Sequence, residues 1–336
     1  MKAMITTLLL ALGASGFAQP EIWGGEISVE QAGDCATSLA LRANVSLFYR
    51  GLEPTAIPDS VELCWGDGSC QNIPLVSAIL LEWNVVMGQY LAEHTYPSRG
   101  AYVLNIEECC YSDDILSFQS EPDIPVRISN TYTFLSPMFQ GCNSQAAPLQ
   151  PPVCLALPGS AFTYNPNIYD PDGDSISYSL TEPAAPAAYL YPQEFDGCTN
   201  SLEIDPITGD LTWDSPCLPG HYLFGIEIKE WRGQVVIAER QILLHVLIDE
   251  ATGLSSITDP GLFQPAPNPT LGMLQLKGAA ETPLGLTLYN VDGQPVREWQ
   301  ALQLPRDVSL EGLGTGIYFL HGTTGKRTFV YKIIKQ

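Results

Sequence analysis

The chain has 336 residues, enough for two or three domains, and its 29 glycines, 27 prolines and 45% hydrophobic residues indicate a folded, turn-rich β protein and not a disordered one. The formal net charge of -22 argues against nucleic acid as a partner, because an acidic surface repels phosphate, and it makes divalent cations a more natural one. The charge is uneven: residues 1–259 carry 32 acidic and 8 basic side chains, whereas residues 260–336 carry 5 and 7.

Residues 1–18 have the pattern of a secretory signal peptide. Lys2 supplies a positive charge, residues 5–12 are apolar, and residues 16–18 place small side chains where signal peptidase cleaves. The apolar run is too short to span a bilayer, which argues against a membrane anchor. We therefore expect export with cleavage after Ala18 and a mature chain that does not span the membrane.

Nine cysteines in an exported chain indicate disulfide bonds. The candidate pairs are Cys64 with Cys70, Cys142 with Cys154, and Cys198 with Cys217. The last two would close proline-rich loops, at about 3 kcal/mol each. The adjacent residues Cys109 and Cys110 are expected to contain an odd thiol or to bond two different partners. Zinc is the rival interpretation, but no C-x₂-C pair occurs and the four histidines are scattered.

Residues 19–128 are expected to form a first β-sandwich. Alternating or apolar runs predict strands at 39–49, 61–65, 75–86 and 100–106. The Trp-Gly-Asp-Gly-Ser run at 65–69, followed by His-Thr-Tyr-Pro at 94–97, resembles the PKD domain, an extracellular Ig-like sandwich. In that family these segments are framework. The resemblance therefore implies that His94 is a corner residue, although a histidine beside Glu93 could also serve as a base.

Residues 129–249 are expected to form a second sandwich, because strand signals recur between Pro- and Gly-rich turns. Asp170, Asp172 and Asp174 place carboxylates at alternate positions of a Gly-containing loop, a pattern that calcium uses. With the Asp-Pro-x-Thr-Gly run at 205–209, this loop resembles cadherin-like modules, in which a later acidic residue shares calcium. By position that residue would be Glu230, although the following Trp231-Arg232 departs from the calcium-binding forms. The alternative is a solvated, turn-forming acidic loop.

Two tryptophans of this second region, Trp213 and Trp231, are expected to lie in the core or on a strand face. The sharper alternative is an exposed aromatic platform for sugars. Residues 250–264 are polar with glycine and serine, which predicts a linker.

Residues 265–336 are expected to form a small Ig-like sandwich, with strands at 273–277, 284–290, 296–300, 308–310, 317–321 and 328–334. Their motifs, in order and spacing, resemble the C-terminal sorting domain of type IX secretion cargo in the Bacteroidetes. The residues that carry the resemblance are Pro267, Asn268, Pro269, Gly272, Asp292, Gly293, Gly316 and Tyr318. The resemblance implies transport across the outer membrane by dedicated machinery and later removal of the domain. The alternative is an ordinary terminal Ig-like domain.

No mature G-x-S-x-G, H-E-x-x-H, P-loop or dinucleotide fingerprint occurs, so we expect a protein without catalytic activity. The prediction is a secreted or cell-surface adhesion or scaffold protein, associated with attachment or gliding motility, exported by the type IX machinery. The alternative is an extracellular carbohydrate-binding protein or an accessory module of a polysaccharide-degrading system. Its partners would be the secretion machinery and a surface polysaccharide or protein, and its only cofactor structural calcium.

Overall fold

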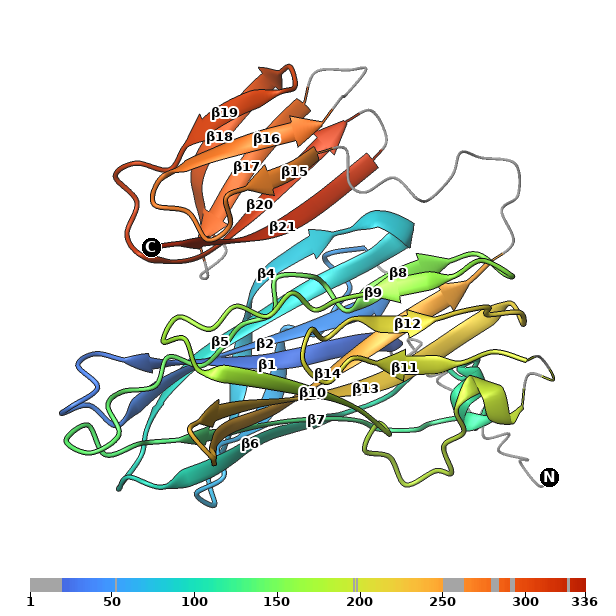
Figure 1. The fold of residues 1–336 in the computed structure, drawn as a ribbon, viewed down its shortest axis with the longest axis horizontal. Coiled ribbons are helices and arrows are strands. Elements are labelled where there is room, and N and C mark those ends of the chain that lie inside the picture. The colour runs from blue at the N-terminus through green and yellow to red at the C-terminus, as the bar shows by residue number, and fades with distance from the viewer. Residues whose placement is uncertain are drawn as a thin grey trace, which may run out of the picture.

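The computed structural model describes residues 20–51, 53–195, 197, 199–249, 263–278, 284–290, 294–324 and 327–336. The expected signal peptide, most of the expected linker, Cys198, Asp292 and Gly293 lie outside these residues. Within the described ranges the chain is built from β-sheets with three short 3-10 turns, which confirms the predicted all-β class. Residues 20–249, here called the body, carry the C-terminal domain, residues 263–336, on one side (Figure 1).

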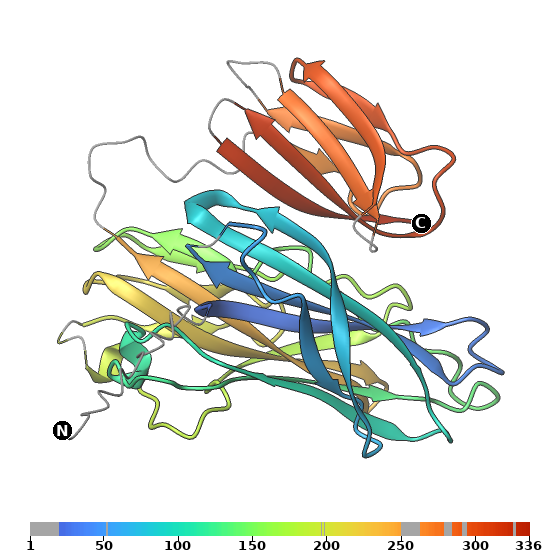
Figure 2. The ribbon, with the colours of Figure 1, turned by 180° about the vertical axis from the view of Figure 1, so that it is seen from behind.

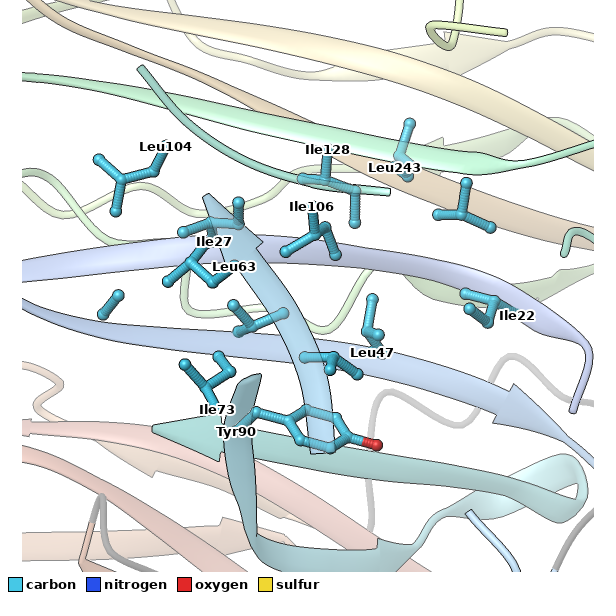
Figure 3. Packing of buried hydrophobic residues seen from close by; sticks show 14 of the residues in the cluster. Ile22, Ile27, Leu47, Leu63, Ile73, Tyr90, Leu104, Ile106, Ile128 and Leu243 are labelled. Atoms are coloured by element: carbon cyan, nitrogen blue, oxygen red, sulfur yellow. The ribbon is translucent and has the colours of Figure 1, made fainter. Parts of the chain in front are cut away.

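The first part of the body closes on itself through strand pairing. Its elements are β1 (Ile22–Ala32), β2 (Ala40–Arg50), β3 (Ser60–Cys64), β4 (Cys70–Leu80), η1 (Glu82–Asn84), β5 (Val85–Thr95), β6 (Ala101–Glu108), η2 (Leu116–Phe118) and β7 (Val126–Thr133). They hydrogen-bond in the order β1-β2-β5-β4-β3-β6-β7. Strand β14 (Val235–Ile248) then pairs with β7 through Ala238–Arg240 and, farther along the same edge, with β1 through Gly25 and Leu243. Apolar side chains such as Leu47, Tyr90 and Ile128 fill the interior (Figure 3).

The second part of the body is a smaller two-layer unit. Its remaining elements are β8 (Val153–Ala156), β9 (Phe162–Tyr164), β10 (Ser175–Thr181), η3 (Pro192–Glu194), β11 (Leu202–Ile204), β12 (Leu211–Trp213) and β13 (Gly220–Arg232). Strands β10, β13, β14 and β8 form one layer, and β11-β12-β9 form the other. Trp213, Tyr222 and Phe224 are fully buried between them.

Strand β14 belongs to both parts, so the two expected sandwiches share one continuous sheet. Ala238–Arg240 pair with β7, whereas His245–Ile248 pair with β8. The expected domain boundary after residue 128 falls inside β7. Tyr132 and Phe134 lie beyond that boundary and still pack into the first core. The body is consequently one sheet system with two cores.

The segments that resemble the PKD framework meet at one corner of the first part. His94 Nε2 lies 2.7 Å from Asp67 Oδ2, and its ring stacks on Trp65 at 5.0 Å. The hydroxyl of Tyr96 donates to the Trp65 carbonyl at 2.9 Å. Gly66 has a φ of +81°, and a Cβ there would lie 2.6 Å from the Val103 backbone. His94 therefore ties strands together.

The predicted continuous strand over residues 75–86 is wrong in its middle. Strand β4 ends at Leu80, and η1 reverses the chain into β5. Trp83 and Asn84 adopt φ values of 57° and 58°, the left-handed region that lets so short a segment turn. The hairpin leaves Trp83 40% exposed at its tip.

Three disulfide bonds are placed completely by the described residues, and they revise the predicted pairing. Cys64 bonds Cys70, as expected. Cys142 bonds Cys35 and not Cys154, because the loop after β7 returns to the β1–β2 loop. Cys109 bonds Cys110, so neither holds the odd thiol and neither bonds a distant partner. Cys217 is also disulfide-bonded, and its predicted partner Cys198 lies outside the described residues.

The unpaired thiol in the described ranges is Cys154. Strand β8 turns its side chain toward the second core, and burial raises the pKa of this thiol to about 12. A thiol that stays protonated reacts slowly, so Cys154 is a structural cysteine.

The C-terminal domain is a separate two-sheet sandwich. Its strands are β15 (Phe263–Ala266), β16 (Met273–Gly278), β17 (Leu284–Asn290), β18 (Pro295–Leu302), β19 (Arg306–Ser309), β20 (Gly316–Thr324) and β21 (Arg327–Lys335). They pair as β15-β16-β19 and β18-β17-β20-β21 around a core of their own. The six strands predicted here are all present. Figure 2, from behind, shows the second sheet turned toward the body.

Candidate ligand-binding site

The four residues predicted to hold calcium lie near one another but serve other partners. Asp170 Oδ1 accepts hydrogen bonds from the backbone amides of Asp172 and Asp174 at 2.9 and 2.8 Å, which shapes the loop as a turn. Asp172 Oδ2 accepts from the amide of Ser144 at 2.6 Å. Glu230 is 2% exposed and points inward. No group of three or more His, Cys, Asp or Glu side chains able to hold a metal ion is found among the described residues.

The guanidinium of Arg232 lies against this loop and supplies a positive charge to it. Its Nε and Nη2 donate to the two oxygens of Asp174 at 2.9 and 2.5 Å. Its Nη1 donates to the carbonyls of Gln140 and Cys142, both at 2.8 Å, and its Nη2 to Asn143 Oδ1 at 3.2 Å. Five oxygen atoms thus surround one positive charge supplied by the chain itself. Arg232 is the residue at which the sequence departs from the calcium-binding pattern.

Glu230 is a buried carboxyl at the back of this cluster. Its oxygens accept from the Ala146 amide at 2.8 Å and from Asn143 Nδ2 at 3.1 Å. Burial raises its pKa to about 7, although the charge of Arg240 and these hydrogen bonds oppose the rise. Neither oxygen is directed to the calcium loop as a ligand, which leaves the predicted set incomplete.

The raised pKa of Glu230 gives a pH-dependent stability. The pKa of Glu230 is higher in the folded state than in the unfolded state. The stability that this carboxyl contributes is therefore fully present below pH 4.5 and is lost as the pH rises through about 7. The loss amounts to roughly 3 kcal/mol. The free energy of unfolding is to be measured in urea for the wild type and for Glu230→Gln. Between pH 4.5 and pH 8, the value for Glu230→Gln is expected to rise relative to that of the wild type by this same amount. A difference between the two proteins that does not change with pH would contradict the assignment.

A pocket of about 540 Å³ lies at the opposite end of β1, where the two parts of the body meet. This volume is in the range of small-molecule sites. Its aromatic walls are Trp23 and Trp83, and its polar lining includes Arg50, Asn84 and Asp249. These residues come from β1, β2, η1 and the end of β14, which only the closed pairing of β1 with β14 brings together.

Polar groups behind the pocket hold Arg50 in place. Its Nη1 donates to Asp114 at 2.7 Å and to the Ser112 hydroxyl at 3.1 Å, and its guanidinium carbon lies 5.6 Å from the Trp23 ring centroid. Ser112 Oγ in turn lies 2.9 Å from Glu21 Oε2. The cation is therefore compensated, and it lies at the edge of the pocket beside Trp23.

Two histidines form the floor beneath Trp23. His221 Nδ1 lies 3.1 Å from His245 Nε2, and the His245 ring stacks on Trp23 at 4.1 Å. Burial lowers the pKa of both histidines below its usual value, most strongly for His245, so both are neutral at pH 7. His245 Nδ1 and Trp23 Nε1 are buried without a hydrogen-bond partner in the part of the chain that the structure describes. Such atoms are costly unless water or a ligand satisfies them.

The two tryptophans expected in the core or on a strand face lie there. Trp213 is fully buried in the second core, and Trp231 is half-buried on β13 and donates its indole N–H to Ser177 at 2.8 Å. The pocket tryptophans were missed. A local signal existed for Trp83, since the polar residues Glu82 and Asn84 flank it within an otherwise largely apolar run.

Of the sorting-motif residues, those in the described ranges connect the start of the C-terminal domain with its last strands. Asn268 binds β21 twice: its Nδ2 donates to the Lys332 carbonyl at 2.7 Å, and its Oδ1 accepts from the Ile334 amide at 2.8 Å. Gly272 and Gly316 have φ values of 151° and 157°, and the Tyr318 hydroxyl donates to the Gly314 carbonyl at 2.9 Å. Pro267 and Pro269 flank Asn268, so the motif pins the start of the domain to its last strand.

Comparison with known proteins identifies the C-terminal domain. Residues 266–336 match the family described as secretion system C-terminal sorting domain. No curated protein matches the chain. No helix among the described residues is long and apolar enough to cross a membrane.

Solved structures of low similarity cover most of the chain. The N-terminal four Ig domains of Dscam1 isoform 6.44 match at 8% identity and a TM-score of 0.18, over 93% of this chain and 91% of that one. Native alpha-2-macroglobulin from Escherichia coli, spanning domains MG0-NIE-MG1, matches at 8% identity and a TM-score of 0.19, over 90% and 96%. Likeness at this level supports no conclusion about function.

Proposed function

We propose that the chain is a non-catalytic adhesion or scaffold protein of the outer cell surface, delivered by type IX secretion in a member of the Bacteroidetes. The observation that supports this most is the sorting-domain match at residues 266–336. In this proposal the C-terminal domain is the address and the body is the working part, with PKD-like and cadherin-like modules fused through β14.

The chemistry of the pocket network also favours a role without catalysis. The Ser112 hydroxyl lies against the carboxylates of Glu21 and Asp114, which do not deprotonate it efficiently at neutral pH. His221 Nε2 faces Asp114 at 3.5 Å, and its other ring nitrogen is taken up by His245. These groups serve to orient Arg50 and Trp23.

A second candidate function, carbohydrate binding by the body, is favoured by the pocket itself. The exposed indole of Trp83 offers a flat apolar face to a sugar ring, and Arg50, Asn84 and Asp249 offer hydrogen-bonding groups for hydroxyls. The low net charge of that lining suits a neutral sugar better than an anionic one. We propose that adhesion proceeds through this pocket, with a surface polysaccharide as its ligand.

The test of the pocket is retention on a panel of insoluble polysaccharides. We expect Trp83→Ala to weaken the retention of the full chain about tenfold or more, because loss of a stacking aromatic costs ~1.5 kcal/mol. Phe139→Ala is the matched control, since Phe139 is an 85% exposed aromatic residue that does not line the pocket. Equal retention of the wild type and Trp83→Ala would leave only the scaffold proposal.

A further inference from the structure

The C-terminal domain contacts the body through a shared apolar cluster. From the body come Trp23, Phe48, Ile79, Val85, Met87 and Val153; from the C-terminal domain come Phe319 and, packed against them, Tyr289 and Ile317. The body residues lie mainly on the outward face of β2, β4 and β5, the face opposite the first core. Figures 1 and 2 show β20 and β21 lying over this part of the body from both sides.

Strand alternation explains how one sheet of the C-terminal domain serves two interfaces. On β20, Tyr318 and Leu320 point into the domain's own core, whereas Ile317 and Phe319 point to the body. On β21, Ile333 belongs to the domain core, and its neighbour Lys332 faces Glu26 of β1. Because side chains alternate along a strand, the outward set is available for docking without disturbing the domain fold.

Charged groups accompany the apolar contact. Lys332 Nζ lies 3.9 Å from Glu26 Oε1, and Arg240 Nη1 lies 3.9 Å from Glu26 Oε2. Lys332 is 8% exposed, and burial lowers its pKa. A buried lysine is costly without a compensating anion, so Glu26 makes the contact selective for this orientation. At the end of the chain, Gln336 hydrogen-bonds the Tyr169 hydroxyl.

A small pocket of about 40 Å³ lies between the two surfaces, lined by Ser46 and Leu91 from the body and by Phe319 and Lys332 from the C-terminal domain, among others. This space holds one to three water molecules, and Glu26 Oε2, which lacks a hydrogen-bond partner among the described residues, borders it. Strand β21 also lies against η1, the turn that carries Trp83.

We propose that this outward face of the body is a specific docking surface for the chain's own C-terminal domain, which stays bound after the chain is cut in residues 250–262. The described contacts lie outside that segment, and they combine an apolar centre with a buried ion pair, as stable interfaces do. Cutting the covalent connection leaves these contacts in place. It removes only the high effective concentration of the C-terminal domain at the docking surface. The sorting address is then a domain that must be lifted from the body and not merely severed from it.

The test uses the full chain with a specific protease site introduced in residues 250–262. After complete cutting at micromolar concentration, we expect the two wild-type pieces to elute together in size-exclusion chromatography. We expect Ile317→Glu to separate them, because it places a charge in the apolar centre. Gln275→Glu, which adds the same charge on the exposed face of β16, should leave them together.

Phe48→Glu makes the same disruption from the body side, so a folding defect of the C-terminal domain cannot produce both results. Separation of the wild-type pieces immediately after cutting would overturn the proposal. Co-elution of the Ile317→Glu and Phe48→Glu pieces would overturn it as well. Elution of the uncut wild-type chain as a dimer would show that a second copy, and not the same chain, covers this face.

Discussion

Replacing Arg232 with methionine is expected to destabilise the body by about 2–3 kcal/mol, because the substitution leaves Asp174 without its cation and three other oxygen atoms without their donor. Arg232 is 26% exposed in its side chain, so solvent screening keeps the loss below that of a fully buried pair. For a unit of this size, the melting temperature should fall by roughly 5–10 °C. Thermal unfolding followed by circular dichroism measures the shift.

Arg127→Met is the control for this substitution. Arg127 pairs with Glu107 at 2.8 Å, but both side chains are about half exposed, and such surface pairs contribute less than about 1 kcal/mol. The same experiment decides between arginine and calcium. If Arg232 serves as the cation of the Asp170 loop, EDTA leaves the wild-type melting temperature unchanged. A fall in melting temperature with EDTA, restored by calcium, would favour the calcium prediction.

Deleting residues 263–336 is expected to abolish export across the outer membrane and to leave the body in the periplasm. The deletion removes the whole sorting domain but neither of the two cores of the body. Asn268→Ala is the milder variant, because it removes the two hydrogen bonds that fasten the start of the domain to β21. We expect it to reduce the exported fraction severalfold, measured by immunoblotting of medium, surface and periplasm.

Gln275→Ala, on the exposed face of β16, is the control for Asn268→Ala and should be exported like the wild type. Normal surface delivery of the deleted chain would contradict the assignment of the address to these residues. If the deletion blocks delivery but Asn268→Ala is delivered normally, the result contradicts only the role assigned to the Asn268 side chain.

Local sequence patterns were sufficient for much of the fold. The alternation in β2 and the strands of the C-terminal domain follow from period-two burial, which a sequence displays directly. The corner of Trp65, His94 and Tyr96 followed from a resemblance, and the contacts of His94 with Asp67 agree with it. Each of these features depends on neighbours in sequence or on a known motif.

Features that depend on distant pairing could not be predicted. Strand β14 joins β1, β7 and β8, and nothing in its own apolar run specifies three partners. The same pairing assembles the Trp23 pocket from both ends of the body, and the return of the loop after β7 brings Cys142 to Cys35. In each case the determining contact joins residues far apart in the sequence, such as Gly25 with Leu243 or Cys35 with Cys142, beyond the reach of spacing arguments.

The calcium prediction depends on a different kind of information. The alternating carboxylates were identified correctly, and so was the departure at Arg232. What spacing does not reveal is that β13 carries the guanidinium into the loop while Glu230 stays buried, since an irregularity in the strand register between Glu230 and Trp231 breaks the alternation that would otherwise put residues 230 and 232 on one face.

The central claim is that the chain is a type IX cargo whose body is the working part, and the intact mass of the protein from its own host tests it most directly. Protein recovered from the cell surface and the medium should begin at Gln19 and end near residue 260, which requires loss of both the signal peptide and the sorting domain. A mature chain that still carries residues 263–336 and is confined to the periplasm would contradict the claim.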